Sequence, residues 1–343
     1  MATRVSVPPD WASLSDEELL DVRMADLPIE IEGSVLAERI AQLQEELAAR
    51  DLQFPLRFYL SDEWFTPDGS SAIAIPFYLA HPRLEKLEET QMLEVEGGEH
   101  EWCMRILRHE TGHAVDNSYR LRLRRTRREL FGSPKKPYPE FYTPRPYSKS
   151  FVLHLDAWYA QSHPDEDFAE TFAVWLTPTS DWRTRYRGWS ALKKLEYMDT
   201  LMAGVKGKPA RMNGLEEIDP LRRLRKTLRQ HYRHKRRYYG VDYPNFYDRD
   251  LRRLVSDSDE FTGNMTAAQF IGRMRRTVRR VVAEWTGIYQ YTIDQVLEDM
   301  VSRCKELRLR LAVPEEQARQ EFTVLLTVQT MNYLHSGGHR LML

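Results

Sequence analysis

The chain has 343 residues, of which 42% are hydrophobic, 29% charged and 11% aromatic, so it can bury a large core and has the length of two or three domains. This composition excludes a disordered chain. No apolar run approaches the roughly 18 to 20 residues that cross a bilayer, and the N-terminal segment lacks the apolar core of a secretory signal. The sequence therefore predicts a cytoplasmic protein with no membrane partner. The two cysteines, Cys103 and Cys304, lie far apart, which excludes an all-cysteine zinc site and leaves histidines and carboxylates as metal ligands.

The net charge of −1 conceals an uneven distribution of charge. Residues 1–100 hold 21 Asp and Glu against 7 Lys and Arg, whereas the remaining residues hold 30 acidic and 43 basic side chains. This separation indicates either that two parts of the chain dock on each other or that an acidic partner binds the basic part. The arginine-dense stretches 120–128 and 222–237 would also suit a nucleic-acid-binding protein, but a solvated helix face is the more frequent reason for such a stretch, so nucleic acid is the weaker expectation.

In chain order, the first predicted elements are a short helix that begins at Ser15, a helix over 34–51 and two strands over 56–62 and 71–80, which a turn separates. Pro76 has no backbone donor, so it makes at least part of the second strand an edge. An edge strand offers unpaired backbone groups on which an extended substrate can lie, although a purely structural role is the alternative.

The rest of the chain reads as helical apart from one loop. A long helix is predicted over 99–123, an extended proline- and tyrosine-rich loop over 132–150, and helices over 164–176 and 189–203. The glycine, proline and lysine residues of 204–214 mark a boundary, which predicts domains at 1–205 and 206–343. Four further helices are predicted over 219–239, 266–286, 290–312 and 314–335, and they suit a bundle.

His109-Glu110-Thr111-Gly112-His113 is an HExxH sequence within the predicted helix 99–123. A four-residue step places both imidazoles on one helix face, where they can bind one cation, while Glu110 points beside them toward a water on that cation. A catalytic zinc usually needs a third protein ligand. Gly112 is costly inside a helix, so we expect some other group to approach the helix backbone closely there.

A second cluster follows in the predicted helix 164–176. Glu166 and Glu170 lie four residues apart and share one face, as expected if one binds the metal and the other orients a ligand histidine. An exposed acidic helix start is the structural alternative. The spacing alone does not decide which of the two carboxylates is the ligand.

HETGHAVD followed by YAQSHPDEDFAETF resembles the zincin metallopeptidases of the gluzincin type, and among them the bacterial putative zinc-binding metallopeptidase family and the catalytic domain of lethal-factor-like zinc peptidases. The resemblance extends over about 55–200. It implies a zincin-like metallopeptidase domain with a small sheet and active-site helices for this part of the chain. Together with the helical spacing beyond 205, which predicts an all-helical C-terminal domain, this gives an α+β fold.

The resemblance also implies roles for individual residues. It places Zn²⁺ on His109, His113 and Glu166, with Glu170 orienting a ligand histidine and Tyr159 stabilising the transition state. The implied function is a zinc-dependent metallopeptidase, in which Glu110 activates a zinc-bound water for hydrolysis of a peptide or amide bond. The alternative is a catalytically silent zinc fold that binds or regulates acidic partners through its basic surface.

Several residues near these motifs have two interpretations. Tyr138, Tyr142 and Tyr147 in the loop 132–150 form either a wall or lid over the substrate or ordinary loop packing. We favour a helix cap over a substrate contact for His163, whereas for Asp116 a hydrogen bond near the active helix and plain solvation are equally expected.

Overall fold

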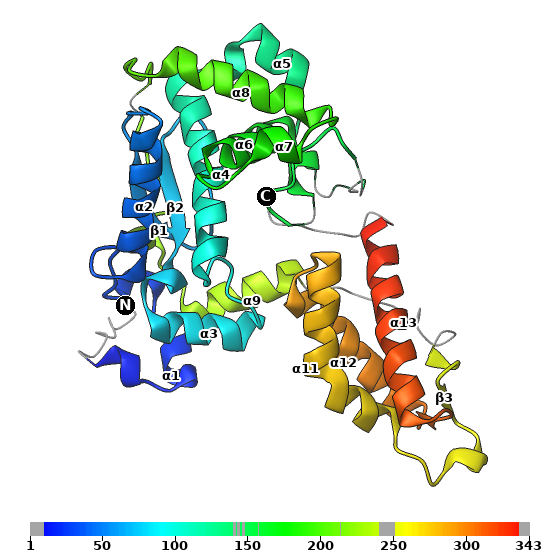
Figure 1. The fold of residues 1–343 in the computed structure, drawn as a ribbon. Helices are drawn as coiled ribbons and strands as arrows, with labels where there is room; N and C mark the ends of the chain where they lie inside the picture. The colour runs from blue at the N-terminus through cyan, green and yellow to red at the C-terminus, as the bar shows by residue number, and fades with distance from the viewer. Residues whose placement is uncertain are drawn as a thin grey trace. The chain divides into compact units, whose positions relative to one another are not determined.

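The computed structural model describes residues 10–139, 142, 145, 148–156, 158–212, 214–239 and 251–335. They form a helix-dominated α+β structure with two small two-stranded sheets, which confirms the predicted fold class at that level (Figure 1). The chain divides into two compact units, Met1–Gln91 with Val95–Tyr232 and Met92–Glu94 with Arg233–Leu343. Within the described ranges, no helix is both long enough and apolar enough to span a bilayer.

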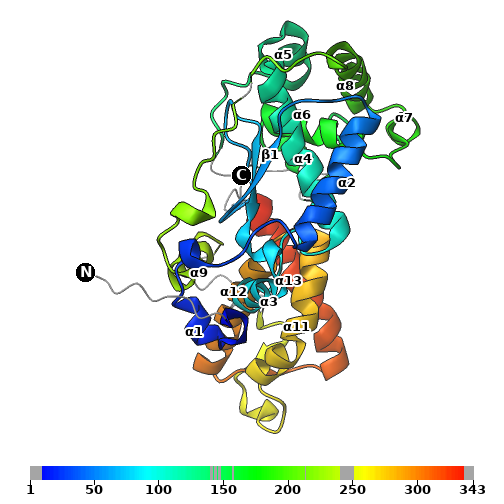
Figure 2. The same cartoon turned by 90° about the vertical axis from the view of Figure 1, so that its left-hand side faces the viewer.

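The first unit is built around helix α4, His100–Tyr119, which packs against α2, α6 and strand β2 (Figures 1 and 2). Nearly every residue of α4 from Cys103 onward is buried, because neighbours cover it on several sides. Arg120, in the left-handed conformation with φ 52°, ends the helix four residues before the last residue of the predicted helix. The other helices of this unit are α1 Asp16–Leu20, α2 Val35–Ala49, α3 Pro82–Met92, α5 Arg125–Phe131, α6 Pro164–Leu176, α7 Trp182–Arg185 and α8 Ala191–Val205.

Helix α6 has the bounds that the sequence predicts. The His163 side chain accepts a hydrogen bond from Asp165 N, and Pro164 occupies the first helical position. The cap interpretation of His163 is therefore confirmed. Three acidic residues follow in the first turn, where the helix dipole favours negative charge.

The small sheet has a pairing direction that the sequence left open, and its second strand is shorter than predicted. Strands β1, Arg57–Ser61, and β2, Ala72–Pro76, are parallel neighbours, with Arg57 opposite Ala72, and residues 77–80 form a 3-10 helix instead of continuing the strand. On the side of β2 away from β1, Ala74 N donates to Phe65 O at 2.8 Å. The side chains of β2 are buried throughout. Ala74, in the middle of β2, is therefore already paired with another part of the chain. The expectation that an extended substrate pairs with this edge of the sheet is wrong for the middle of the strand.

Residues 206–232 pack against earlier parts of the first unit. Ser71 N donates to Gly214 O at 2.8 Å, and the Tyr59 hydroxyl donates to Ile218 O at 3.0 Å. Further along, Leu228 N donates to Val22 O. The compact unit consequently ends at Tyr232, whereas the predicted boundary lies at 205/206.

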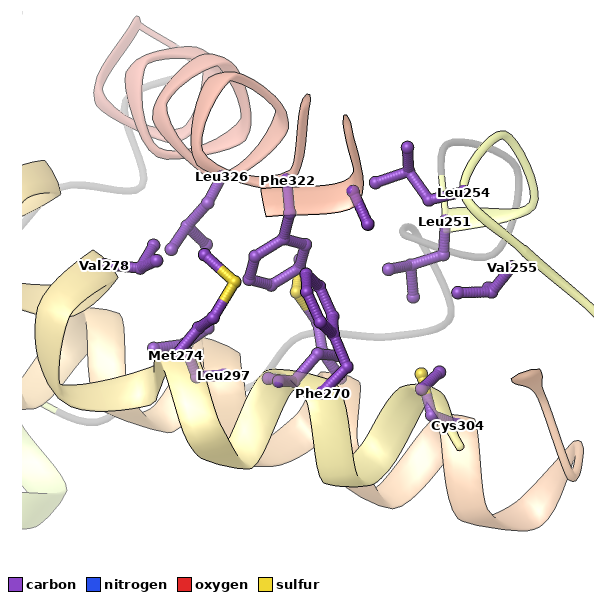
Figure 3. Packing of buried hydrophobic residues seen from close by; sticks show 14 of the residues in the cluster. Leu251, Leu254, Val255, Phe270, Met274, Val278, Leu297, Cys304, Phe322 and Leu326 are labelled. Atoms are coloured by element: carbon purple, nitrogen blue, oxygen red, sulfur yellow. The ribbon is translucent and has the colours of Figure 1, made fainter. Parts of the chain in front are cut away.

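The second unit has its own apolar core. Helices α11, Ala267–Thr286, α12, Gln290–Glu306, and α13, Glu315–His335, surround it, and Figure 3 shows the rings of Phe270 and Phe322 meeting there, with centroids 5.9 Å apart. The unit is not all-helical, because β3, Val255–Ser256, and β4, Arg310–Leu311, form a short antiparallel pair. Helix α12 accordingly ends at Glu306 and not at 312. The predicted helix 219–239 is present as α9, Leu228–Tyr239, and begins later than 219.

Candidate metal centre

Helix α4 presents the two histidines of the HExxH sequence on one face. The Nε2 atoms of His109 and His113 lie 3.2 Å apart, and their ring centroids are separated by 4.9 Å. His109 is 2% exposed, whereas His113 keeps part of its ring accessible. The pair is therefore a two-nitrogen site that is reached from the His113 side.

Helix α6 crosses α4 at Gly112, between the two histidines. A Cβ atom at Gly112 would lie 2.7 Å from the α-carbon and 3.1 Å from the carbonyl oxygen of Ala169, so only glycine allows this approach. The close approach expected from the sequence is confirmed. It brings Glu166 and Glu170 of α6 against the histidines of α4.

Glu166 supplies the third candidate ligand atom. Its Oε2 lies 2.9 Å from His109 Nε2 and 3.2 Å from His113 Nε2, so these three atoms form a nearly equilateral triangle. His109, His113 and Glu166 are thus a group that can hold one metal ion. Glu170 instead contacts His109 on the other side of the ring.

The triangle fits zinc. Ligand atoms at the roughly 2.0 to 2.1 Å typical of zinc occupy tetrahedral corners about 3.3 Å apart, close to the 2.9 to 3.2 Å between these atoms. Two imidazoles and one carboxylate are also the ligand set of a known class of catalytic zinc sites, which leave the fourth corner open.

Glu170 fixes the orientation of His109. Its Oε1 accepts a hydrogen bond from His109 Nδ1 at 2.8 Å, and its Oε2 accepts one from Leu155 N at 2.9 Å. When the ring is neutral, as a metal ligand must be, this contact keeps its proton on Nδ1, and the lone pair of Nε2 points toward His113 and Glu166.

The electrostatics of the cluster favour a cation. Burial lowers the pKa of both histidine rings, but nearby carboxylates outweigh burial and raise it above the ordinary value, Glu166 and Glu170 for His109 and Glu166 for His113. Burial likewise opposes ionisation of Glu166, yet the two rings hold the pKa of its carboxyl well below the usual range. Burial opposes ionisation of Glu170 as well, yet its hydrogen bond to His109 lowers the pKa of its carboxyl. Without metal, protonated imidazoles thus balance two buried, ionised carboxylates, and a metal ion that displaces those protons would balance the same negative charge.

The remaining acidic residues of the α6 start pair with buried cations. Asp165 accepts a hydrogen bond from the fully buried Arg127, which also lies 3.1 Å from Asp116 Oδ2. Lys194 Nζ lies 2.6 Å from Asp167, whose pKa burial raises to about 7. The interpretation of this segment as an exposed acidic helix start is therefore wrong. Of the two interpretations of Asp116, the hydrogen bond is confirmed, since its carboxylate is buried and contacts Arg127.

Glu110 has a partner that the sequence analysis missed. Thr66 Oγ1 donates to Glu110 Oε2 at 2.8 Å from the turn between β1 and β2. Asn117, one turn beyond His113, anchors that turn by donating to Pro67 O and Ser70 O at 3.0 and 2.7 Å. No local pattern marks Thr66, because its role depends on how the turn folds onto α4.

Two tyrosines lie at the cluster in different ways. The Tyr159 ring is 5.5 Å from the His109 ring, and burial, with Glu166 and Glu110 nearby, raises its pKa well above 10. Tyr138 Oη donates to Glu166 Oε1 at 2.8 Å. Tyr142 is buried in the same loop, while Tyr147 lies outside the described residues.

Comparison with known proteins agrees with this geometry. Residues 103–203 match the sequence model of a family described as "Putative zinc-binding metallo-peptidase". The matched stretch contains the HExxH sequence and all of α6, and hence the three candidate ligands. No curated protein and no solved structure matches the chain. At the level of the family, the match and the His-His-Glu cluster together support a zinc-binding metallopeptidase.

Proposed function

We propose that the protein is a zinc-dependent metallopeptidase of the zincin, gluzincin-type class that hydrolyses a peptide or amide bond in a peptide or protein substrate. The observation that carries the proposal is the convergence of His109 Nε2, His113 Nε2 and Glu166 Oε2 beside Glu110. Zinc held there would supply Lewis-acid chemistry, which acidifies water and polarises a carbonyl group.

The residues of the chain have separate tasks in this reaction. Glu110 takes the proton of the attacking water and delivers it to the departing amine. Thr66 holds one oxygen of Glu110 and thereby directs the other, Oε1, toward that proton. Glu170 keeps His109 in the tautomer that leaves Nε2 free of a proton.

Tyr159 is the proposed donor to the developing oxyanion. Its raised pKa keeps the phenol protonated at neutral pH, as a hydrogen-bond donor requires. A well-placed donor of this kind contributes on the order of 3 to 4 kcal/mol of transition-state stabilisation.

The test combines metal analysis with hydrolysis of a quenched fluorescent peptide library. We expect the wild type to bind one zinc per chain and to cleave the library. Glu110→Gln should keep the zinc and lose hydrolysis, whereas His113→Ala should lose both. His100→Ala is the matched control, because His100 lies on the same helix and contacts Gln42 outside the cluster.

Two results would decide against the proposal. Equal zinc content in the wild type and His113→Ala would show that the cluster is not the metal site. Zinc binding without hydrolysis by the wild type would favour the silent zinc fold that binds acidic partners.

A further inference from the structure

The loop between α5 and α6 places a phenol on the candidate ligand Glu166. Tyr138 Oη donates to Oε1 of Glu166 at 2.8 Å, while Oε2 faces the two histidines. The two oxygens of one carboxylate thus have different partners. A phenol can donate to an ionised carboxylate, which only accepts, so the contact is a charge-assisted hydrogen bond.

The ring of Tyr138 is itself held in place by the start of α6. It stacks on the His163 ring, with centroids 3.8 Å apart and planes inclined by 18°. His163 caps α6 through Nδ1, and its Nε2 donates to Lys136 O at 2.7 Å. His163 therefore binds the backbone of the loop two residues before Tyr138, and the phenol and Glu166 are fixed to the same helix end.

We infer that Tyr138 is a positioning residue that restricts Glu166 to a single ligand oxygen and so sets the affinity and coordination number of the metal site. A carboxylate without this hydrogen bond can rotate and offer both oxygens to an ion. Occupied Oε1 leaves Oε2 as the ligand atom, which preserves a three-ligand site with an open corner. The inference rests on the proposed function only in requiring that the cluster bind zinc.

The role differs from that of Tyr159. Tyr138 contacts the carboxylate ligand, whereas Tyr159 packs beside the His109 ring. Loss of the Tyr138 hydroxyl should therefore change metal binding even when no substrate is present.

The experiment measures zinc affinity of the full-length protein by competition with a chromogenic chelator at neutral pH. Tyr138→Phe removes the hydroxyl and keeps the stacked ring. We expect its zinc Kd to rise roughly 10- to 100-fold, as is typical when a hydrogen-bond partner of a metal ligand is lost. Tyr59→Phe is the matched control, since its hydroxyl contacts Ile218 away from the cluster, and its Kd should equal that of the wild type.

A spectroscopic measurement separates positioning from a general loss of structure. In the cobalt-substituted protein, Tyr138→Phe should weaken the visible absorption of Co²⁺, because a second carboxylate oxygen enters the coordination sphere. A zinc Kd within twofold of the wild type, or an unchanged cobalt spectrum, would overturn the inference. Failure of the wild type to bind zinc at all would instead overturn the proposed function.

Discussion

At the scale of single residues, the contact between Gly112 and Ala169 determines whether the metal cluster can assemble. Gly112 lies between the two histidines on α4, and Ala169 lies next to Glu170 on α6. A side chain at Gly112 would separate the helices that carry the ligands. The glycine therefore costs helix propensity in order to permit a close helix crossing.

Gly112→Ala should destabilise the protein by about 1 to 3 kcal/mol, because the added methyl group overlaps backbone atoms of Ala169, which cannot move aside as a side chain would. Gly204→Ala is the control, since a Cβ at Gly204 in α8 has nothing within 4 Å. There the higher helix propensity of alanine should add up to about 1 kcal/mol. Urea unfolding of both variants measures the difference, and a Gly112→Ala protein as stable as the wild type would contradict the crossing geometry.

His154 gives the first unit a dependence on acid. Burial lowers its pKa to about 4, although Glu170 and the carbonyl of Arg105 favour its charged form, while Arg105 and His109 add to the lowering. Between pH 6.5 and 4 the folded state keeps the ring neutral while the unfolded chain takes up a proton. Stability that is present above pH 6.5 is therefore lost as the pH falls to 4, by on the order of 3 kcal/mol for this shift.

His154→Gln should show a smaller loss of stability over the same range, because an amide can donate to Arg105 O but does not titrate. Unfolding by urea at several pH values between 4 and 6.5, with a chelator to remove bound metal, measures the slope for both proteins. Identical slopes would mean that His154 does not remain neutral in the folded state.

At the scale of elements, sequence periodicity predicted the ligand-bearing helices well and their surroundings less well. HExxH and the capped start at Pro164 are local patterns, so α4 and α6 could be located from them. The four cluster residues that these helices carry were located with them: His109, His113, Glu166 and Glu170. Thr66 and Tyr138 lie in turns and loops, and their contacts with Glu110 and Glu166 depend on long-range folding. The parallel pairing of β1 and β2 was missed for the same reason.

Arg127 connects three helices of the first unit. It extends from α5 to Asp116 on α4 and Asp165 on α6, and it is completely buried. Arg127→Met should lower the free energy of unfolding by about 3 to 5 kcal/mol, because buried Asp165 loses its arginine partner and buried Asp116 keeps only Arg122, 3.6 Å away. The exposed Arg125, paired with Glu129 on the same helix, provides the control, and Arg125→Met should cost at most about 1 kcal/mol. Thermal unfolding of the two variants compares the effects, and equal midpoints would exclude a structural role for the buried arginine.

At the scale of the whole molecule, the uneven charge of the sequence is partly neutralised inside the first unit. Lys226 lies 2.6 Å from Asp62, and Arg229 contacts Glu17 and Asp21. Basic residues from beyond 205 thus pair with the acidic first hundred residues. The change of composition at 204–214 suggested a boundary because glycine and proline mark irregular backbone. Irregular backbone can also pack within a compact unit, as Gly214 does when it accepts a hydrogen bond from Ser71 N, directly before β2.

The division after Tyr232 leads to a prediction about truncation. A chain of residues 1–239 retains α9 and every backbone hydrogen bond from 206–232 to the first unit, so it should fold and bind zinc with the affinity of the full chain. A chain of residues 1–205 leaves the backbone N–H of Ser71, directly before β2, without Gly214 and the buried Tyr59 hydroxyl without Ile218. Both are buried polar groups that would lose their partners. We expect this shorter chain to unfold at a lower temperature and to bind zinc more weakly. Matching melting temperatures and zinc Kd values for the two chains would show that 206–232 is dispensable and that the boundary suggested by composition is the energetic one.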